Sequence, residues 1–261
     1  MRACYHTHTQ RCGHARGTDE EYVRAAIDAG VRLLGFADHA PMLYPFNYVS
    51  GFKMRPEQIE DYFSSLLSLR EKYRGQIEIK IGFETEYYPE LWESALNFWR
   101  NYPIDYLILG QHFISGEKYI EGEQYSGNPS DSRERLSAYA DRLISAINTG
   151  KITYIAHPDL FNYVGEGGEE VYLFEMRRVI NEAKRLSIPL ELNLLGLSEG
   201  RSYPKEAFWR EVGKIGGDVV IGCDAHSPDR VAKAEELLAA QKYAEKFGLK
   251  LVDRVELHPV F

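Results

Sequence analysis

The sequence predicts an α/β protein in which βα units either close into a barrel or form an open, doubly wound sheet. Apolar, β-branched segments alternate with segments of helical periodicity along the whole chain, as expected for consecutive βα units. The strand-like segments are almost continuously apolar, which is typical of parallel strands covered on both faces. No low-complexity tract or Pro/Gly/Ser-rich linker divides the 261 residues, so we expect a single domain over residues 1–261.

Seven strands are expected from the apolar segments. In chain order they lie in RACYHTH near the N-terminus, VRLLGFADH to His39, IEIKIGFETE to Glu86, DYLILGQH to His112, ITYIAH to His157, IPLELNLL to Leu195 and DVVIGCDAH to His226. Two segments between these elements, Pro41–Arg55 and Gly116–Pro129, are expected to be loops that lie over a site, because loops on a rigid scaffold commonly carry function.

Six helices are expected between the strands. The first opens with the capping-box spacing of Thr18 and Glu21, and several glycines are placed where helices would stop, at Gly30, Gly75, Gly150 and Gly248. The expected helices are Thr18–Gly30, Pro56–Tyr73, Leu91–Asn101, Asp131–Thr149, Glu169–Leu186 and Lys205–Ile215.

The composition excludes several classes of protein. Lys and Arg number 31 against 39 Asp and Glu, a net charge of −8, and such a balance gives no attraction to nucleic acid or to an anionic membrane. No apolar run approaches the roughly 20 residues that cross a bilayer, and the N-terminus does not resemble a signal peptide. We therefore expect a cytoplasmic protein. Three cysteines without a CxxC pair indicate neither a disulfide framework nor a thiolate zinc site.

Six of the seven expected strands end in residues that can bind a divalent metal. These residues are His6 and His8, Asp38 and His39, Glu84, His112, His157, and Asp224 with His226. In a parallel barrel the carboxyl ends of the strands converge on one face, where such folds place their active sites. We therefore expect these side chains to meet.

The spacing of these residues argues against coincidence. A single histidine at a strand end is more often a hydrogen-bonded structural residue than a ligand. The triplet HTH, however, places His6 and His8 two residues apart, so that both side chains leave an extended strand on the same face. The triplet DAH repeats this spacing for Asp224 and His226.

The residue types indicate more than one metal ion. Imidazole and carboxylate without thiolate suit zinc, manganese or iron, and the candidates outnumber one tetrahedral shell. Glu84 and Asp224 are the candidates for a carboxylate that bridges two ions. Clustered cations polarise a phosphoryl group and lower the pKa of a bound water, so phosphoester hydrolysis is the leading reaction class.

The ordered series HTHTQRCGH, GFADH, GFETE, GQH, AHPD and GCDAHSP resembles the polymerase and histidinol phosphatase (PHP) superfamily over nearly the whole chain. The resemblance implies a distorted, TIM-like (β/α)7 barrel with the metal site at the carboxyl ends of the strands. It also implies three ions, held by His6, His8, Glu84 and Asp224; by Glu84, His112 and His157; and by His14, His39 and His226.

Within the superfamily, the length and the stretch LELNLLGLSEGRSYPKEAFW are most similar to the monofunctional histidinol phosphatases. That similarity implies a phosphoric monoester hydrolase acting on L-histidinol phosphate in histidine biosynthesis. We hypothesise in-line attack by a metal-bridging hydroxide, with Asp38, Glu84 and His226 as the catalytic candidates. Asp38 is expected to orient a ligand rather than to move a proton. The nucleophilic routes lack their motifs, since DxDx[TV], Cys-x5-Arg and RHG are all missing.

Arg16 and Arg201 are the candidates for binding phosphate, because a guanidinium can fork onto it. A solvent-exposed position is the alternative for each, and Lys53 and Arg55 are expected to be solvated. The sequence departs from the pattern of the branch where Arg commonly follows the histidine of the fifth strand and the GL of the sixth-strand loop; here those places hold Phe161, Asn162, Tyr163 and Ser198. The departure affects the choice of substrate rather than the phosphatase chemistry.

Two other functions remain open at this point. One is a related phosphoesterase that acts on another small phosphorylated metabolite or on a nucleotide end. The other is a metal-stabilised accessory domain without turnover, although none of the nine expected ligand positions is lost and crowded acids and imidazoles destabilise a fold unless cations bind them. The expected partner is a small phosphorylated metabolite, and the oligomeric state is left open.

Overall fold

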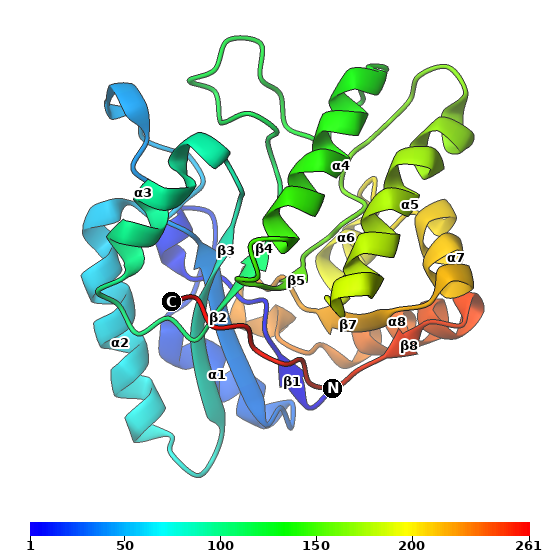
Figure 1. Ribbon diagram of the computed structural model, residues 1–261. Helices are drawn as coiled ribbons and strands as arrows, with labels where there is room; N and C mark the ends of the chain where they lie inside the picture. Colours follow the sequence, from blue (N-terminus) through cyan, green and yellow to red (C-terminus); the bar gives the residue numbers. More distant parts are fainter.

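A computed structural model describes residues 1–261. Eight parallel strands form one curled sheet in the order β1 to β8, with the helices on its outer side (Figure 1). The strands are β1 Ala3–Cys4, β2 Leu33–His39, β3 Glu78–Thr85, β4 Tyr106–Leu109, β5 Ile152–Ile155, β6 Leu190–Asn193, β7 Asp218–Gly222 and β8 Lys250–Leu251.

The sheet closes on itself only at the carboxyl ends of its strands. Beyond β1 and β7, Thr7 and Ala225 form a parallel bridge, in which the backbone N–H of His8 donates to the carbonyl of Ala225 at 3.0 Å. At the amino end of β7, the short strand β8 pairs with β7 in place of β1, with Asp218 opposite Lys250. The expected distorted, TIM-like α/β barrel is confirmed.

The number of strands expected from the sequence was wrong by one. Strand β8 is only two residues long and both are exposed, so it carries no apolar signal. The sixth expected strand also ends earlier than predicted, at Asn193. The Asn193 side chain accepts a hydrogen bond from the backbone N–H of Gly196 at 2.9 Å and thereby begins a short helix.

Eight helices connect the strands, and each of the six expected helices is among them. They are α1 Asp19–Asp28, α2 Ile59–Lys72, α3 Pro89–Trp99, α4 Arg133–Ile147, α5 Gly168–Leu186, α6 Leu194–Glu199, α7 Glu206–Ile215 and α8 Ala234–Phe247. The capping box of Thr18 and Glu21 is present at α1, while α6 and α8 were not among the predicted helices. No helix combines the length and the apolarity that crossing a bilayer requires.

A small apolar cluster fills the end of the barrel opposite to the closed edge. It contains Tyr5, Tyr106 and Tyr154 from the inner face of the sheet, together with Val255 from the C-terminal tail. The tail runs across this end of the molecule (Figure 1), and the backbone N–H of Val255 donates to the Tyr5 hydroxyl at 3.4 Å. The polar residues of the inner face are thereby confined to the carboxyl ends of the strands.

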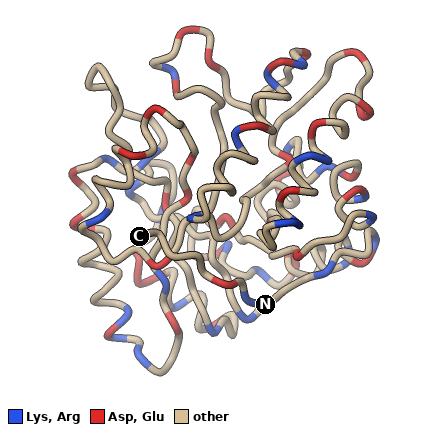
Figure 2. The backbone as a smooth tube through the Cα atoms, in the orientation of Figure 1, with Lys and Arg blue, Asp and Glu red and all other residues tan.

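Charged residues of both signs are interspersed along the backbone, as Figure 2 shows. Two long connections rise above the carboxyl ends of the strands (Figure 1). One follows β2 and includes Pro41–Arg55, and the other follows β4 and includes Gly116–Pro129. Both loops contribute walls to the cavity described below, as expected from the sequence.

Candidate metal centre

The carboxyl ends of the strands bring together every residue of the expected ligand set. His6 and His8 follow β1, His39 ends β2, and Glu84 lies near the end of β3. His112, His157, Asp224 and His226 lie two to four residues beyond β4, β5 and β7, and His14 follows a short 3-10 helix, Gln10–Cys12. Each of the nine side chains belongs to at least one trio whose potential ligand atoms lie within 4.8 Å of one another: His6, His8 and Glu84; His6, His157 and Asp224; His39, Glu84 and His112; and His14, His39 and His226. The resemblance groups the same residues differently, since it adds Asp224 to the first trio and places His157 with Glu84 and His112.

The first group contains His6, His8, Glu84 and Asp224. The Nε2 atoms of His6 and His8 lie 3.2 Å apart, and Oδ1 of Asp224 lies 3.1 Å from His8 Nε2 and 3.5 Å from His6 Nε2. Oε2 of Glu84 lies 3.5 Å from the same nitrogen of His6 and 3.6 Å from that of His8. Two ring nitrogens and two carboxylate oxygens therefore surround one point.

The second group uses the other oxygen of Glu84. Oε1 of Glu84 lies 2.8 Å from Nε2 of His157 and 3.7 Å from Nε2 of His112. Since Oε2 faces the first group, Glu84 lies between the two groups in the position of a bridging carboxylate. Gly110 makes this possible, because a Cβ there would lie 1.8 Å from Oε1 of Glu84.

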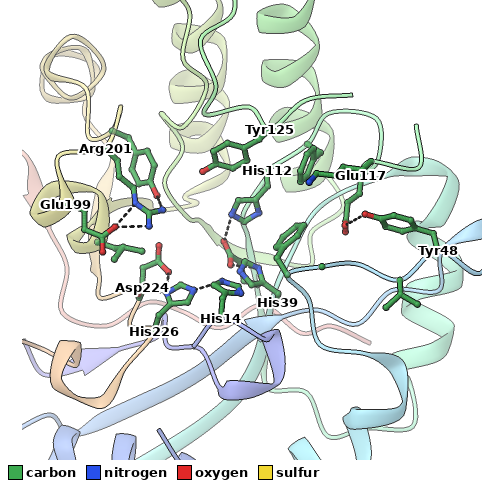
Figure 3. Close-up of a pocket in the computed structure, with 18 residues that line it drawn as sticks. His14, His39, Tyr48, His112, Glu117, Tyr125, Glu199, Arg201, Asp224 and His226 are labelled. Atoms are coloured by element: carbon green, nitrogen blue, oxygen red, sulfur yellow. Dashed lines mark hydrogen bonds and ion pairs between the residues drawn. The ribbon is translucent and has the colours of Figure 1, made fainter. Parts of the chain in front are cut away.

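The third group contains His14, His39 and His226. The Nε2 atoms of His14 and His226 lie 3.0 Å apart, and Nδ1 of His226 is fixed by the backbone carbonyl of Asp224 at 3.0 Å. Nδ1 of His39 lies 3.0 Å from Oε2 of Glu84. His14 is exposed whereas His39 is buried, so this group faces the solvent side of the centre (Figure 3).

Two observations show that these residues fit bound metal ions. Oε2 of Glu84 is buried and makes no hydrogen bond, although three ring nitrogens surround it within 3.6 Å. Leaving a buried acceptor unpaired typically costs about 1–3 kcal/mol. In addition, two pairs of ring nitrogens lie only 3.0–3.2 Å apart, in His6 with His8 and in His14 with His226. Such close approach is expected where the lone pairs of both nitrogens coordinate the same cation.

Burial and neighbouring charges shift the pKa values of Glu84, His39 and His112. Burial alone would raise the pKa of Glu84, but the coulombic effect of His39, His112 and His6 holds it well below its ordinary value. Burial lowers the pKa of His39 and of His112 well below the usual range. At these three positions the carboxylate is ionised and the imidazoles are neutral, the form in which such side chains bind metals. At His6, His8 and His157, by contrast, burial is outweighed by neighbouring carboxylates, which raise the pKa of each ring.

Two of the ligand positions have a strained backbone. His157 and Asp224 adopt positive φ angles of 29° and 48°, a region that non-glycine residues rarely occupy and that costs on the order of 1–3 kcal/mol. Both residues follow directly on buried strand segments. The strain turns their side chains toward Glu84 and His8, which they contact.

Buried carboxylates hold the histidines from behind. Asp38, which the sequence marked as a catalytic candidate, is fully buried outside the cavity; it lies 3.4 Å from Nδ1 of His8 and accepts hydrogen bonds from Thr9 Oγ1 and the His39 backbone. This contact matches the expected orienting role. Glu86 is also buried, and its Oε1 lies 3.3 Å from Nδ1 of His112.

Glu191 and Asn193 are functional candidates that the sequence reading missed. Oε2 of Glu191 lies 2.8 Å from Nδ1 of His6, and Asn193 donates to Asp224 Oδ2 at 3.0 Å and to Glu191 Oε1 at 2.7 Å. Both residues are buried on β6, the strand for which no ligand was expected. The alternating polar residues in LELN were the available signal, since a buried strand needs a reason to carry them.

The ligands open into a cavity of about 790 Å³. Arg201, Glu199 and Tyr203 form one wall, and Tyr48, Phe52 and Glu117 line another part (Figure 3). The Arg201 guanidinium pairs with Glu199 at 2.8–3.0 Å and donates to the Tyr203 hydroxyl at 3.2 Å. A cation therefore stands beside the metal-binding groups.

The other basic candidates lie elsewhere. Arg16 is exposed, pairs with Asp229 at 3.6 Å and does not line the cavity. Lys53 was expected to be solvated, and this was wrong: its ammonium is buried in contact with Glu86 and lies 3.9 Å from Glu117. The acids that bury it come from β3 and from the loop after β4, and their proximity cannot be read from the sequence around Lys53.

Cys12 lies close to this centre as well. Its sulfur lies within 4.8 Å of ring nitrogens of His8 and His226. The thiol donates a hydrogen bond to the carbonyl of Thr9 at 3.1 Å, so the local backbone already provides it with a partner.

Known proteins resemble the chain over most of its length. A protein named "probable histidinol-phosphatase" from Deinococcus radiodurans is 28% identical over 232 residues, covering 87% of this chain and 86% of the relative. A protein of the same name from Schizosaccharomyces pombe is 26% identical, covering 97% and 89%. The crystal structure of a histidinol phosphate phosphatase from Lactococcus lactis, complexed with zinc, L-histidinol and phosphate, superimposes with a TM-score of 0.73 at 18% identity and covers 96% of this chain and 95% of that one.

The sequence pattern of the PHP domain family matches residues 5–195. This span includes seven of the nine residues at the metal centre, namely His6, His8, His14, His39, Glu84, His112 and His157. Asp224 and His226, which follow β7, complete the set. The expected family is thus confirmed by a match over most of the chain. The chain belongs to the PHP domain family.

Proposed function

We propose that the protein is a metal-dependent phosphomonoesterase that hydrolyses L-histidinol phosphate to L-histidinol and phosphate. The observation that carries the proposal is the convergence of nine potential ligands, eight of them from the carboxyl ends of six strands, on one open cavity beside Arg201. The histidinol-phosphatase names of the relatives from two distant organisms support the same substrate.

The proposed centre holds two to three divalent ions of zinc, manganese or iron. His6, His8, Glu84 and Asp224 would hold one; Glu84, His112 and His157 a second; and His14, His39 and His226 a third. Such ions, when bound, polarise the phosphoryl group, activate water and neutralise the charge that develops on the phosphate oxygens. The chain itself fixes the positions of the ligands through Asp38, Glu86 and Glu191, whose contacts aim the opposite ring nitrogens at the centre.

Arg201 is the proposed phosphate-binding residue. Its guanidinium lines the cavity and pairs with Glu199 at the protein surface. A phosphate between the ligand groups and this wall would receive forked hydrogen bonds from it. Arg16, the other residue expected to bind phosphate, has its side chain 79% exposed outside the cavity, which favours Arg201.

We further propose that residues 1–261 form one PHP-type phosphoesterase domain. Strand β7, which lies beyond the family match, supplies Asp224 and His226. Strand β8 pairs with β7, and Val255 of the C-terminal tail packs into the apolar cluster at the opposite end of the same barrel. The cytoplasmic location remains a prediction from the sequence.

Steady-state assays of metal-reconstituted protein test this function. The enzyme is expected to cleave L-histidinol phosphate with a higher kcat/KM than other phosphorylated metabolites in a panel, and to cleave p-nitrophenyl phosphate in preference to its bis-ester. Preferred cleavage of the bis-ester or of nucleotide ends would replace this substrate with a nucleotide-type one. No hydrolysis of any ester with zinc, manganese or iron supplied would indicate an accessory domain without turnover.

A further inference from the structure

We propose that Glu117 accepts a hydrogen bond from the ring N–H of the leaving alcohol, and that Tyr48 and Phe52 form the flat wall against which its heterocycle lies. This inference rests on the proposed function. It names the residues that recognise the heterocycle of the substrate. It makes Glu117 a determinant of specificity for a heterocyclic alcohol rather than a participant in the cleavage of the phosphate ester.

Glu117 lies at the end of the cavity away from the phosphate-binding candidate. Figure 3 shows Glu117 and Tyr48 on one side of His112 and His39, with Asp224 and Arg201 on the other. All of these residues line the same cavity. A phosphate bound at the ligands and Arg201 would therefore direct its leaving group toward Glu117.

The flat apolar surface of this region starts at the metal-binding groups. The ring of Phe52 lies 5.2 Å from that of His39 and 5.7 Å from that of His112, edge to face with both. Tyr48 continues the wall, with its hydroxyl bonded to Oε2 of Glu117 at 3.2 Å. A planar ring can stack on such a surface while its edge reaches the carboxylate, an arrangement that aromatic groups favour.

The buried carboxylate of Glu117 can accept one more hydrogen bond. Its side chain is only 1% exposed, and its protein partners are the hydroxyls of Tyr44 and Tyr48 together with Lys53 at 3.9 Å. Lys53 is in much closer contact with Glu86. Two buried carboxylates thus share one ammonium, and a buried charge that is incompletely paired is costly. A ring N–H or imidazolium from the ligand would supply the missing partner.

The two tyrosines act as donors in this arrangement. Burial, followed by the charge of Glu117, raises the pKa of Tyr48 to about 12, and the pKa of the buried Tyr44 is also raised well above its usual value. Each hydroxyl therefore keeps its proton and donates a hydrogen bond to one oxygen of Glu117. Each carboxylate oxygen retains a further lone pair for a ligand.

Three phosphate esters separate this assignment from its alternatives. L-histidinol phosphate has the ring N–H and the ammonium group, L-phenylalaninol phosphate has an aromatic ring without N–H, and the phosphate ester of imidazolylpropanol lacks the ammonium group. Wild type and Glu117→Gln are compared by kcat/KM on all three. The preference of wild type for L-histidinol over L-phenylalaninol phosphate is expected to fall by roughly 10- to 100-fold in Glu117→Gln, the usual loss for one hydrogen bond to a charged group.

The preference for L-histidinol phosphate over the imidazolylpropanol ester is expected to be the same in both proteins. A fall in this second ratio alone would assign the ammonium group to Glu117 and overturn the proposal, as would two unchanged ratios. Glu121→Gln, an exposed glutamate on the same loop, is the matched control and should retain both preferences.

Two results on wild type separate failure of this inference from failure of the proposed function. If wild type cleaves p-nitrophenyl phosphate but not L-histidinol phosphate, the proposed function fails. If wild type cleaves L-histidinol and L-phenylalaninol phosphates with equal kcat/KM, the proposed function stands and the role of Glu117 is refuted, even where Glu117→Gln does not fold.

Discussion

The carboxylate oxygen Oε2 of Glu191 lies 2.8 Å from Nδ1 of His6, and both side chains are fully buried. Gly222 on the neighbouring strand β7 accommodates this contact, because a Cβ there would lie 2.1 Å from the same oxygen. With Nδ1 engaged by Glu191, Nε2 of His6 faces Glu84 and Asp224. Glu191 is therefore a positioning residue for a proposed metal ligand.

Glu191→Gln is expected to lower metal affinity by about 10- to 100-fold, the usual effect of losing a carboxylate that orients a ligating histidine. The affinity is measured by competition with a chromophoric chelator, and activity should recover when the metal concentration is raised. Glu170→Gln, at an exposed position on α5, is the control. Wild-type affinity in Glu191→Gln would show that the contact does not tune the centre.

His157→Ala should reduce kcat/KM by at least about 1,000-fold, because it removes a proposed ligand that contacts Glu84. Thermal unfolding should still show a cooperative transition, since the barrel packing around it is otherwise retained. His258→Ala, in the C-terminal tail far from the ligand groups, serves as the matched histidine control. A folded His157→Ala protein with undiminished turnover would remove His157 from the ligand set.

Arg201→Ala is expected to raise KM and the inhibition constant for inorganic phosphate by roughly 10-fold or more, with a smaller effect on kcat, because a charge-assisted phosphate contact is lost. Arg16→Ala should have near-normal constants, since its side chain pairs with Asp229 outside the cavity. The opposite pattern of constants would exchange the roles of the two arginines.

Removal of metal with a chelator is expected to abolish activity and to lower the melting temperature. The ligand groups crowd Glu84, Asp224 and several buried imidazoles into one space, and bound cations stabilise the folded state in proportion to their occupancy. Differential scanning fluorimetry before and after adding back zinc or manganese measures the effect. An unchanged melting temperature in fully metal-free protein would contradict it.

The lowered pKa of Lys205 predicts that the free energy of unfolding rises in mildly alkaline solution. Burial lowers its pKa to about 8 from the ordinary 10.5, although Asp159 opposes the shift. Between these two pH values the unfolded chain binds more protons than the folded one, so the free energy of unfolding contributed by this group increases with pH. The increase should be lost in Lys205→Met. Urea unfolding of both proteins from pH 7 to 10 measures the difference, and parallel curves would refute the prediction.

Strand and helix positions followed from local patterns. Eight of the nine proposed ligands were candidates because they lie at strand ends, whereas His14 came only from the family resemblance. Near-continuous apolar segments marked strands β1 to β7, and the capping signals at Thr18 marked α1 correctly. Three elements escaped prediction: helix α8, which spans 14 residues, and the much shorter β8 and α6, which are only two and six residues long. Elements of this length are formed by pairing with neighbours rather than by their own periodicity.

The sequence by itself determined the α/β class and eight of the nine residues that meet at the centre, because parallel strands bring their carboxyl ends to one face whatever the details of packing. The ordered motifs along the chain indicated the family and added His14. Only the tertiary structure decided that Glu84 rather than Asp224 lies between two ligand groups, and that His8 is the histidine beside Asp38. It alone also showed that Glu191 contacts His6 and that Lys53 is buried. These facts depend on contacts between residues far apart in the chain, and no local pattern of residues encodes such distances.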